Sequence, residues 1–381
     1  MKKALILGTL APQADVVRAL QDDGWFVVAC GRYAGGPALA AVDRFEPVAV
    51  NDIPGVVDLA RRERVEFIHS AGSDKALPTI AAASRALGLP TFSTAETVRL
   101  TGDKKVLRDC LAASGLDPIR YRRVTSSADL DGWDLFPAIV KPADGSGQRG
   151  VFRAHSREEA VRGLPWTLGY SAAGSALVEE FLEGPEVSAN CLVVGGCLAF
   201  CAVSDRLLLD GYTGGLPRAH LLPGPGTAAA AQVRKLAARV VRAIGLENGP
   251  AYLQLKLTSA GPRLLEVAPR LDGCHLWRLI RGVEGVDLLG ASLRLLVGSS
   301  PGALEVEAEA PPKALTFLRA RPWTVFRRAE HPAPAVAEHV AYDYEEGEIV
   351  RPVNGYLERV GYHVASFLGV EKLWPCQGQR D

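Results

Sequence analysis

A glycine-rich segment with a lysine before it is the first stretch whose residue types and spacing could do chemistry. Residues 136–153 read Phe-Pro-Ala-Ile-Val-Lys-Pro-Ala-Asp-Gly-Ser-Gly-Gln-Arg-Gly-Val-Phe-Arg. Glycine has no Cβ, so backbone N–H groups in such a loop can close around phosphate oxygens. The apolar residues on both sides predict a strand, a loop and a returning strand. The segment is therefore predicted to be a flap over phosphates, with loop residues Gly145, Ser146, Gly147 and Gly150.

Two better-known phosphate loops do not fit this segment. A dinucleotide-binding fingerprint needs a helix directly after its glycines, whereas the residues from Val151 onward are typical of a strand. A P-loop has its lysine after the last glycine, whereas Lys141 comes before the first one. The chain also contains no His-Arg-Asp and no Asp-Phe-Gly, which excludes a protein kinase.

A predicted hairpin is the second place where the pattern carries chemistry. Strands over 252–258 and 263–268 are joined by Ser259-Ala260-Gly261, and a three-residue loop that ends in glycine is typical of a hairpin. If Thr258 pairs with Pro262 across this loop, Gln254 lies opposite Glu266.

Residues alternate between the two faces of a strand, so Gln254, Lys256 and Glu266 are expected on one polar face. Such a face could be a polar pair that satisfies itself, or it could have a function that other parts of the chain must indicate. Both interpretations stay open at this point.

The rest of the chain supplies the elements that must position these groups. Alternating strands and helices at the start predict a small parallel α/β sheet. Its predicted elements are strands 3–8, 25–30, 66–70 and 88–92 and helices 14–21, 53–64 and 77–87. After a change of composition near residue 299, short strands are predicted over 314–320, 349–351 and 361–367.

Composition narrows the function classes. The 381 residues carry 43 basic and 43 acidic side chains and no dense basic block, which argues against nucleic acid or an anionic membrane surface as the main partner. No apolar run reaches 18 residues, so no transmembrane helix is expected. The seven cysteines are scattered without Cys-x-x-Cys pairs, which is typical of reduced thiols and predicts a cytoplasmic location.

Four blocks, in this order, resemble the ATP-grasp superfamily of carboxylate–amine ligases, in the branch of L-amino-acid ligases and biotin carboxylases. They are Asp103-Lys104, the flap from Lys141 to Gly150, the segment from Glu179 to Glu186, and Glu266-Val267-Ala268-Pro269-Arg270. The resemblance covers residues 1 to about 297.

The resemblance implies a fold of the α/β and α+β classes. An N-terminal parallel α/β (pre-ATP-grasp) domain is expected over 1–95 and a two-subdomain ATP-grasp fold over 96–300, with the flap subdomain at about 136–178. Residues 301–381 would form a small β-rich C-terminal extension.

The resemblance also implies roles for individual residues. Lys104 and Lys141 would hold the phosphates of ATP under the flap. Residues Glu179, Glu180, Phe181 and Leu182 would form the adenine slot, and Glu186 would accept hydrogen bonds from the ribose.

Glu266 and Gln254 would hold Mg²⁺, although many members have an acidic residue in place of Gln254 and Asn in place of Ala268. We expect Lys256, on the same face, to replace part of the positive charge that weaker metal binding would leave missing. Catalytic roles fall to Lys141 and Arg270, and Arg270 would also grip an anion of the substrate. The other substrate-contacting residues are expected to be Asp272, Gly273, His275, Gly214 and Gly215.

The implied function is an ATP-dependent ligase that joins a small-molecule carboxylate to an amine through an acyl-phosphate, releasing ADP and phosphate. Two alternatives remain. One is a carbamoyl-phosphate-synthase-like ligase that modifies a sugar or cell-surface precursor, and the other is a nucleotide-binding module with weakened catalysis. A homodimer is one option for the assembly.

Overall fold

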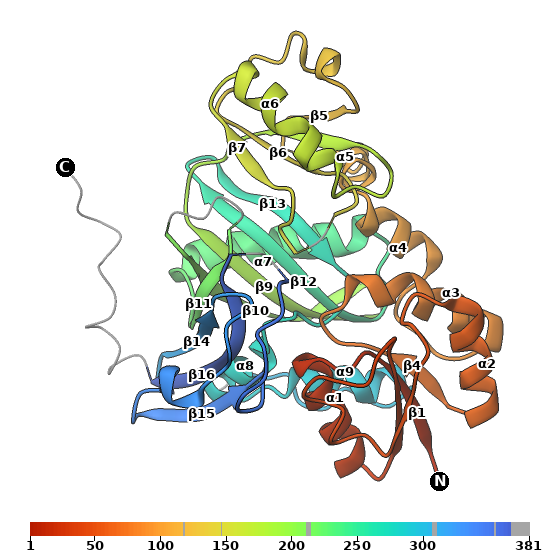
Figure 1. The fold of residues 1–381 in the computed structure, drawn as a ribbon. Coiled ribbons are helices and arrows are strands. Elements are labelled where there is room, and N and C mark those ends of the chain that lie inside the picture. The colour runs from red at the N-terminus through yellow and green to blue at the C-terminus, as the bar shows by residue number, and fades with distance from the viewer. Residues whose placement is uncertain (117–118, 146, 211–214, 307–310, 354–355, 367–381) are drawn as a thin grey trace.

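The computed structural model describes residues 1–116, 119–145, 147–210, 215–306, 311–353 and 356–366. The described elements form three sheets. Figure 1 shows the flap sheet at the top, the large sheet in the middle and the N-terminal unit below it. No helix in these ranges combines the length and the apolar character needed to cross a membrane.

The N-terminal unit is a parallel sheet with strand order β3-β2-β1-β4. Its elements are β1 (Lys3–Leu7), α1 (Ala11–Asp22), β2 (Phe26–Cys30), β3 (Arg44–Glu46), α2 (Ile53–Glu63), β4 (Phe67–His69), η1 (Asp74–Ala76) and α3 (Leu77–Leu87). The predicted parallel α/β sheet is confirmed. The strand predicted over 88–92 is wrong, because no strand forms there. The sheet reaches four strands through β3, which was not predicted. Pro90 cannot donate to a ladder, which disfavours a strand at that place.

Two helices and an antiparallel four-stranded sheet follow, with strand order β5-β8-β6-β7. The Asp103 side chain caps the second helix by accepting hydrogen bonds from the backbone N–H groups of Lys105 and Val106. The elements are α4 (Ala95–Gly102), α5 (Lys104–Ala113), β5 (Tyr121–Val124), η2 (Ser127–Leu130), β6 (Ala138–Pro142), β7 (Phe152–Ala154), α6 (Arg157–Leu168) and β8 (Ala176–Glu180). The strand–loop–strand order predicted for the flap is therefore confirmed by β6 and β7.

The third sheet has eight strands in the order β13-β12-β9-β10-β11-β14-β16-β15. Its strands are β9 (Glu186–Val194), β10 (Cys197–Leu208), β11 (Pro217–Leu222), β12 (Gly249–Thr258), β13 (Gly261–Ala268), β14 (Lys313–Ala320), β15 (Ala337–Tyr342) and β16 (Glu358–Ser366). The accompanying helices are α7 (Thr227–Ala243), α8 (Leu276–Glu284), α9 (Leu288–Leu296) and the short η3 (Arg328–Glu330).

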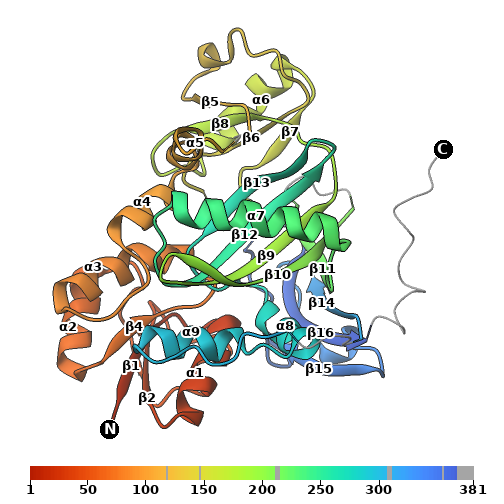
Figure 2. The same cartoon turned by 180° about the vertical axis from the view of Figure 1, so that it is seen from behind.

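The two faces of the large sheet bury different cores. On one face Leu253 and Leu255 of β12 pack in a cluster with Val233 and Ala237 of α7, and Figure 2 shows α7 lying across this face. On the other face a second cluster joins residues of the N-terminal unit, α8, α9 and the C-terminal strands, among them Ile6, Val16, Leu276, Leu315 and Tyr362. The N-terminal and C-terminal parts of the chain therefore share one core.

In the β12–β13 hairpin Gln254 pairs with Glu266 as expected, but the register near the turn differs from the predicted one. Thr258 pairs with Gly261 rather than with Pro262, so the connecting loop has two residues and not three. A β-bulge next to Leu255 then inserts one extra residue and restores the pairing of Gln254 with Glu266.

The C-terminal strands β14, β15 and β16 extend the large sheet instead of forming a sheet of their own. Two predicted strands are found, as β14 and β16. The strand predicted over 349–351 is wrong, since only an isolated bridge joins Ile349 to Val325. Residue Phe367, at the end of the third predicted strand, lies outside the described residues.

Candidate active site

A cavity of about 450 Å³ lies between the flap sheet and the large sheet. The predicted nucleotide and metal residues that line it are Lys104, Lys141, Gly145, Gly147, Glu179, Glu180, Phe181, Leu182, Glu186, Gln254 and Glu266. Gly215, predicted to contact the substrate, lines it as well. Ser146 and Gly214 lie outside the described residues. One cavity therefore collects residues that are up to 162 positions apart in the sequence, from Lys104 to Glu266.

The flap loop closes on the cavity through polar contacts at both of its ends. The Lys104 ammonium donates to the carbonyl of Gly145 (2.6 Å), and the Gln148 amide donates to the carbonyl of Gly215 (2.8 Å). Gly150 lies outside the cavity lining, and its φ is +73°. A Cβ there would lie 2.8 Å from the ring of Tyr170, so this glycine is required by packing as well as by its backbone conformation.

A buried ion cluster forms the floor of the cavity beneath the flap. Lys141 and Arg108 both contact the Glu179 carboxylate, at 2.6 Å and 3.2 Å. Burial lowers the pKa of the Lys141 ammonium to about 8, although Glu179 acts in the opposite direction. Burial opposes ionisation of Glu179, but the charges of Arg108 and Lys141 overcome it and hold its pKa at about 2. Glu179 is therefore the counter-ion of two cations in this structure.

The apolar part of the cavity suits a flat aromatic ligand. Its apolar lining residues include Ile119, Ile139, Phe181, Leu182 and Leu265. The guanidinium of Arg153 lies 3.8 Å from the centre of the Phe181 ring, and the ammonium of Lys256 lies 5.5 Å from it. Cation–π contacts of this kind fix the orientation of the ring that would border an adenine.

Glu186 is engaged by several polar partners on the opposite wall. Arg206 pairs with one of its carboxylate oxygens at 2.5 Å, and the Gln254 amide donates to the same oxygen at 2.8 Å. The Lys256 ammonium lies 3.9 Å from the other oxygen. Among the contacts of the described residues, this other oxygen has the longer one, so it is the oxygen that could accept a hydrogen bond from a ribose hydroxyl.

The metal-binding residues fit Mg²⁺ only in partnership with phosphates. Gln254 and Glu266 are paired across β12 and β13 and both line the cavity. Because the Gln254 amide nitrogen donates to Glu186, its carbonyl oxygen is the ligand that it can offer. Ala268 offers none, and no group of three or more His, Cys, Asp or Glu side chains suited to a metal is found among the described residues. One carboxylate and an amide oxygen suit Mg²⁺ that arrives bound to a nucleotide, since Mg²⁺ commonly keeps waters and phosphate ligands.

The predicted substrate residues Arg270, Asp272, Gly273 and His275 do not line this cavity. Arg270 is buried, and its guanidinium pairs with both carboxylate oxygens of Asp74 from the N-terminal unit, at 2.6 and 2.8 Å. The Arg270 side chain is therefore occupied by a protein carboxylate, a partner that the sequence did not reveal.

Asp272 turns the chain towards α8. One of its carboxylate oxygens accepts hydrogen bonds from the backbone N–H groups of Cys274 and Leu276. The other oxygen is buried and has no hydrogen-bond partner among the described residues. Burial raises the pKa of Asp272 to about 6, against the effect of those backbone hydrogen bonds. An unpartnered buried oxygen of this kind is a place where a polar ligand or a water could bind.

Several residues of the site were missed from the sequence. Arg108 follows Lys104 by four positions on α5, so helical periodicity could have placed the two side chains on one face. Asp15, Asp74 and Arg359 gave no local signal, because their partners lie far away in the sequence, 196 positions away in the case of Asp74 and Arg270.

Comparisons with known proteins agree with this geometry. A family model described as an ATP-grasp domain matches residues 129–274. Among curated relatives, an uncharacterized protein y4rH from Sinorhizobium fredii is 28% identical over 288 residues, which are 71% of this chain and 58% of that protein. Carnosine synthase 1 from Mus musculus is 37% identical over 137 residues, which are 35% of this chain and 16% of that protein. The matched region thus spans less than two thirds of the length of either relative.

Solved structures share the fold over almost the whole chain. L-amino acid ligase from Bacillus licheniformis has a TM-score of 0.80 at 19% identity, covering 98% of this chain and 96% of that one. Phosphoribosylglycinamide synthetase from Anaerococcus prevotii has a TM-score of 0.74 at 17% identity, covering 96% and 93%. Residues 129–274 of this chain thus match an ATP-grasp domain, and the chain shares its fold with these two solved structures.

Proposed function

We propose that this protein is an ATP-dependent ligase that joins a carboxylate to an amine. The observation that carries the proposal is the cavity itself. Lys104 and Lys141 converge there with Glu186 and Glu266, from α5, the flap sheet and the large sheet. Two cations, a ribose acceptor and a hard oxygen ligand are the groups that a bound ATP requires.

The reaction would take place in two steps. An oxygen of the substrate carboxylate attacks the γ-phosphorus of ATP, and the bond to the β-phosphate oxygen breaks to give ADP and an acyl-phosphate. The amine then attacks the acyl carbon, phosphate leaves, and one proton of the amine passes to a base or to solvent. Mg²⁺, when bound, would neutralise charge on the phosphates.

The residues of the chain would bind and orient the reactants. Lys104 and Lys141 would place positive charge against the phosphates, where transition-state charge develops. The flap would exclude water, which is necessary because water competes with the amine for the acyl-phosphate. Glu266 and Gln254 would orient the metal, and Phe181 with its cationic neighbours would hold the base.

The relatives support the same reaction type. By their names, one relative synthesises carnosine and one structural neighbour ligates L-amino acids. The shared fold covers 96% of the L-amino acid ligase chain. The identity of the carboxylate and of the amine remains part of the proposal. A cytoplasmic location is proposed too, which suits the free thiols of the described cysteines.

A screen of carboxylate and amine pairs for ADP formation tests the proposal, with mass spectrometry of the product. The expected result is ADP release that requires both substrates and yields an amide. Glu266→Ala should lower the rate about 10- to 100-fold, by analogy with the loss of a metal-orienting group. Glu247→Ala, at an exposed site outside the cavity, is the control. The proposal fails if no pair raises ADP release above the rate with ATP alone.

A nucleotide-binding module with weakened catalysis is the second candidate. The observation that favours it is the reduced metal set, in which Gln254 brings no charge and Ala268 brings no ligand. Tight binding of MgADP without ADP release under any substrate pair would favour this candidate over the ligase.

A further inference from the structure

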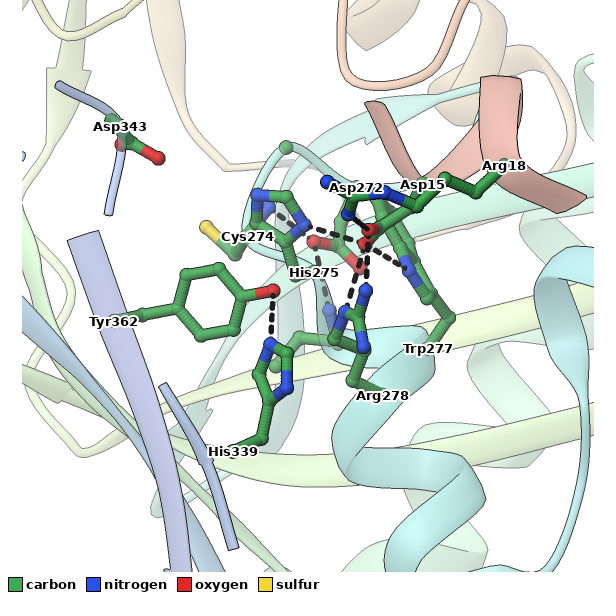
Figure 3. A network of polar contacts seen from close by, with 12 residues as sticks. Asp15, Arg18, Asp272, Cys274, His275, Trp277, Arg278, His339, Asp343 and Tyr362 are labelled. Carbon is green, nitrogen blue, oxygen red and sulfur yellow. Dashed lines mark hydrogen bonds and ion pairs between the residues drawn. The ribbon is translucent and has the colours of Figure 1, made fainter. Parts of the chain in front are cut away.

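One carboxylate of the N-terminal unit contacts His275 and the first turn of α8, at the end of the loop over 271–275 that is predicted to contact the substrate. Asp15 lies on α1, and its Oδ2 accepts hydrogen bonds from His275 Nδ1 (3.0 Å), Trp277 Nε1 (3.0 Å) and Arg278 Nε (2.9 Å). Its other oxygen accepts from a second nitrogen of Arg278. Figure 3 shows these donors converging on Asp15 from the loop and the first turn of α8.

Burial and hydrogen bonding act in opposite directions on the titratable groups of this cluster. Burial opposes the ionisation of Asp15, but the hydrogen bonds from His275 and Arg278 overcome it and hold its pKa well below the usual range. Burial lowers the pKa of His275, although Asp15 raises it. A neutral His275 donates from Nδ1, because an ionised carboxylate can only accept, and its Nε2 is then an acceptor. That Nε2 is buried and has no hydrogen-bond partner among the described residues.

His275 is held in a backbone conformation that a side chain disfavours. Its φ is +60°, in the left-handed region, which a residue other than glycine adopts only when its surroundings enforce it. Asp15 holds the ring on one side. On the other side the ring stacks on Tyr362 of β16, with the centroids 4.5 Å apart, and the Tyr362 hydroxyl contacts His339 of β15 at 3.2 Å.

The loop before His275 is contacted by the same two parts of the chain, the N-terminal unit and the C-terminal strands. The backbone N–H of Gly72 donates to the carbonyl of Leu271 (3.2 Å), so the N-terminal unit contacts the loop directly. On the C-terminal side, the Arg359 guanidinium of β16 donates to the carbonyl of Gly273 (2.6 Å). A Cβ on Gly72 would lie 2.7 Å from the Cα of Gly273, so there is no room between the two backbones. The loop is therefore fixed between both ends of the chain.

We propose that Asp15 is a positioning residue for the ligase reaction. By fixing His275 and α8, it sets the conformation of residues 271–275 and thereby the substrate half of the site, while the nucleotide half is independent of it. This inference rests on the proposed function, because it assigns these residues to substrate binding. Asp15 itself does not line the nucleotide cavity.

The test compares two buried carboxylates of the same unit. Asp15→Asn removes the charge that four donor contacts share. Glu63→Gln is the matched control, because Glu63 is equally buried and pairs with Lys3 and Arg44 but with no residue of the loop. If Asp15→Asn does not fold, Arg278→Gln removes two of the four contacts at a half-exposed position and serves in its place.

Three measurements are made on the full chain of each variant. Amide hydrogen exchange of residues 271–278 should be faster by about tenfold or more in Asp15→Asn, since charge-assisted hydrogen bonds are lost, and unchanged in Glu63→Gln. The dissociation constant for MgADP should stay within about twofold of the wild-type value. With the substrate pair found by the screen, kcat/KM should fall by up to about 100-fold, mainly through KM, because a small displacement of a substrate-binding loop is costly.

The results distinguish a failure of the positioning role of Asp15 from a failure of the proposed ligase function. Unchanged exchange over 271–278 in Asp15→Asn, or an equal change in Glu63→Gln, overturns the positioning role whether or not the protein is a ligase. A parallel loss of MgADP affinity also overturns it, because the effect would then not be confined to the substrate half. Failure of the proposed function shows instead in the wild-type protein, as ADP release that no substrate pair stimulates.

Discussion

The proposed nucleotide half and the proposed substrate half of the site are built in contrasting ways. The nucleotide half consists of the flap, the Glu179–Glu186 segment and the β12–β13 hairpin, each a short motif that carries its own chemistry. The substrate half, around residues 270–275, is held by side chains from both ends of the chain, namely Asp15 and Asp74 from one end and Arg359 from the other.

Because of this difference, we expect the two parts of the site to respond to different kinds of change. A motif on adjacent strands keeps its geometry as long as the local ladder forms. A loop held by distant partners depends on how three parts of the chain pack together, and the shared core provides this packing. Changes in the N-terminal unit should therefore alter the substrate half while leaving nucleotide binding intact.

The largest expected effect comes from breaking the ion cluster of the nucleotide half. Glu179→Gln leaves Lys141 and Arg108 buried without their shared counter-ion, which should lower the free energy of unfolding by about 3–5 kcal/mol. Urea denaturation measures it. Glu180→Gln is the control, because Glu180 pairs with the exposed Arg120 and should change stability by less than about 1 kcal/mol. Equal losses in the two variants would contradict the proposed importance of the cluster.

The same variant has a pH signature. Because the pKa of Glu179 is depressed in the folded state, from 4.5 to about 2, its contribution to stability is present above pH 4.5 and is lost as the pH falls towards 2. Wild-type stability should therefore decline more steeply in this window than that of Glu179→Gln.

A smaller effect is expected where the N-terminal unit meets the substrate half. Asp74→Asn removes the carboxylate that pairs with the buried Arg270, and should cost about 2 kcal/mol or less because the Asp74 side chain is 35% exposed. MgADP affinity, measured by calorimetry, should not change. A loss of affinity comparable to that from a change in the cavity would show that the two halves are coupled.

The smallest effect concerns the pH dependence of nucleotide binding. With a pKa of about 8, Lys141 loses most of its charge between pH 7 and pH 9, so its protonated fraction falls about tenfold over this range. Calorimetric affinity for MgADP should fall with rising pH by up to that factor. Lys141→Arg should remove the dependence, because arginine stays protonated. A flat wild-type profile would indicate that Lys141 does not contact the phosphates.

The hairpin illustrates how far local patterns reach. Alternation and the paired strands were enough to place Gln254 opposite Glu266, but the turn itself was predicted with one residue too many. The β-bulge shifts the register by one residue, so Gln254 still pairs with Glu266. A single sequence gives no reliable sign of a bulge. The predicted pairing was therefore right, although the predicted turn was wrong.

The C-terminal strands show what local patterns fail to predict, namely which strands pair. Strands β14 and β16 were recognisable as short apolar runs, yet nothing in them indicated that they continue the large sheet beside β11. Pairing between strands about a hundred residues apart is decided by which edge remains open, and that depends on the whole fold.

The sequence by itself determined the strand–loop–strand flap and the parallel N-terminal sheet, whereas the metal-binding and nucleotide-binding roles came from the resemblance to a family and stay proposals. The flap and the parallel sheet follow from short-range rules, namely the conformations open to glycine and the alternation of strands with helices. Only the tertiary structure decided that Arg270 pairs with Asp74, that His275 pairs with Asp15 and that Arg359 reaches the carbonyl of Gly273. A carboxylate and its cation attract over a few ångströms of space, and only the folded chain sets which of them come that close.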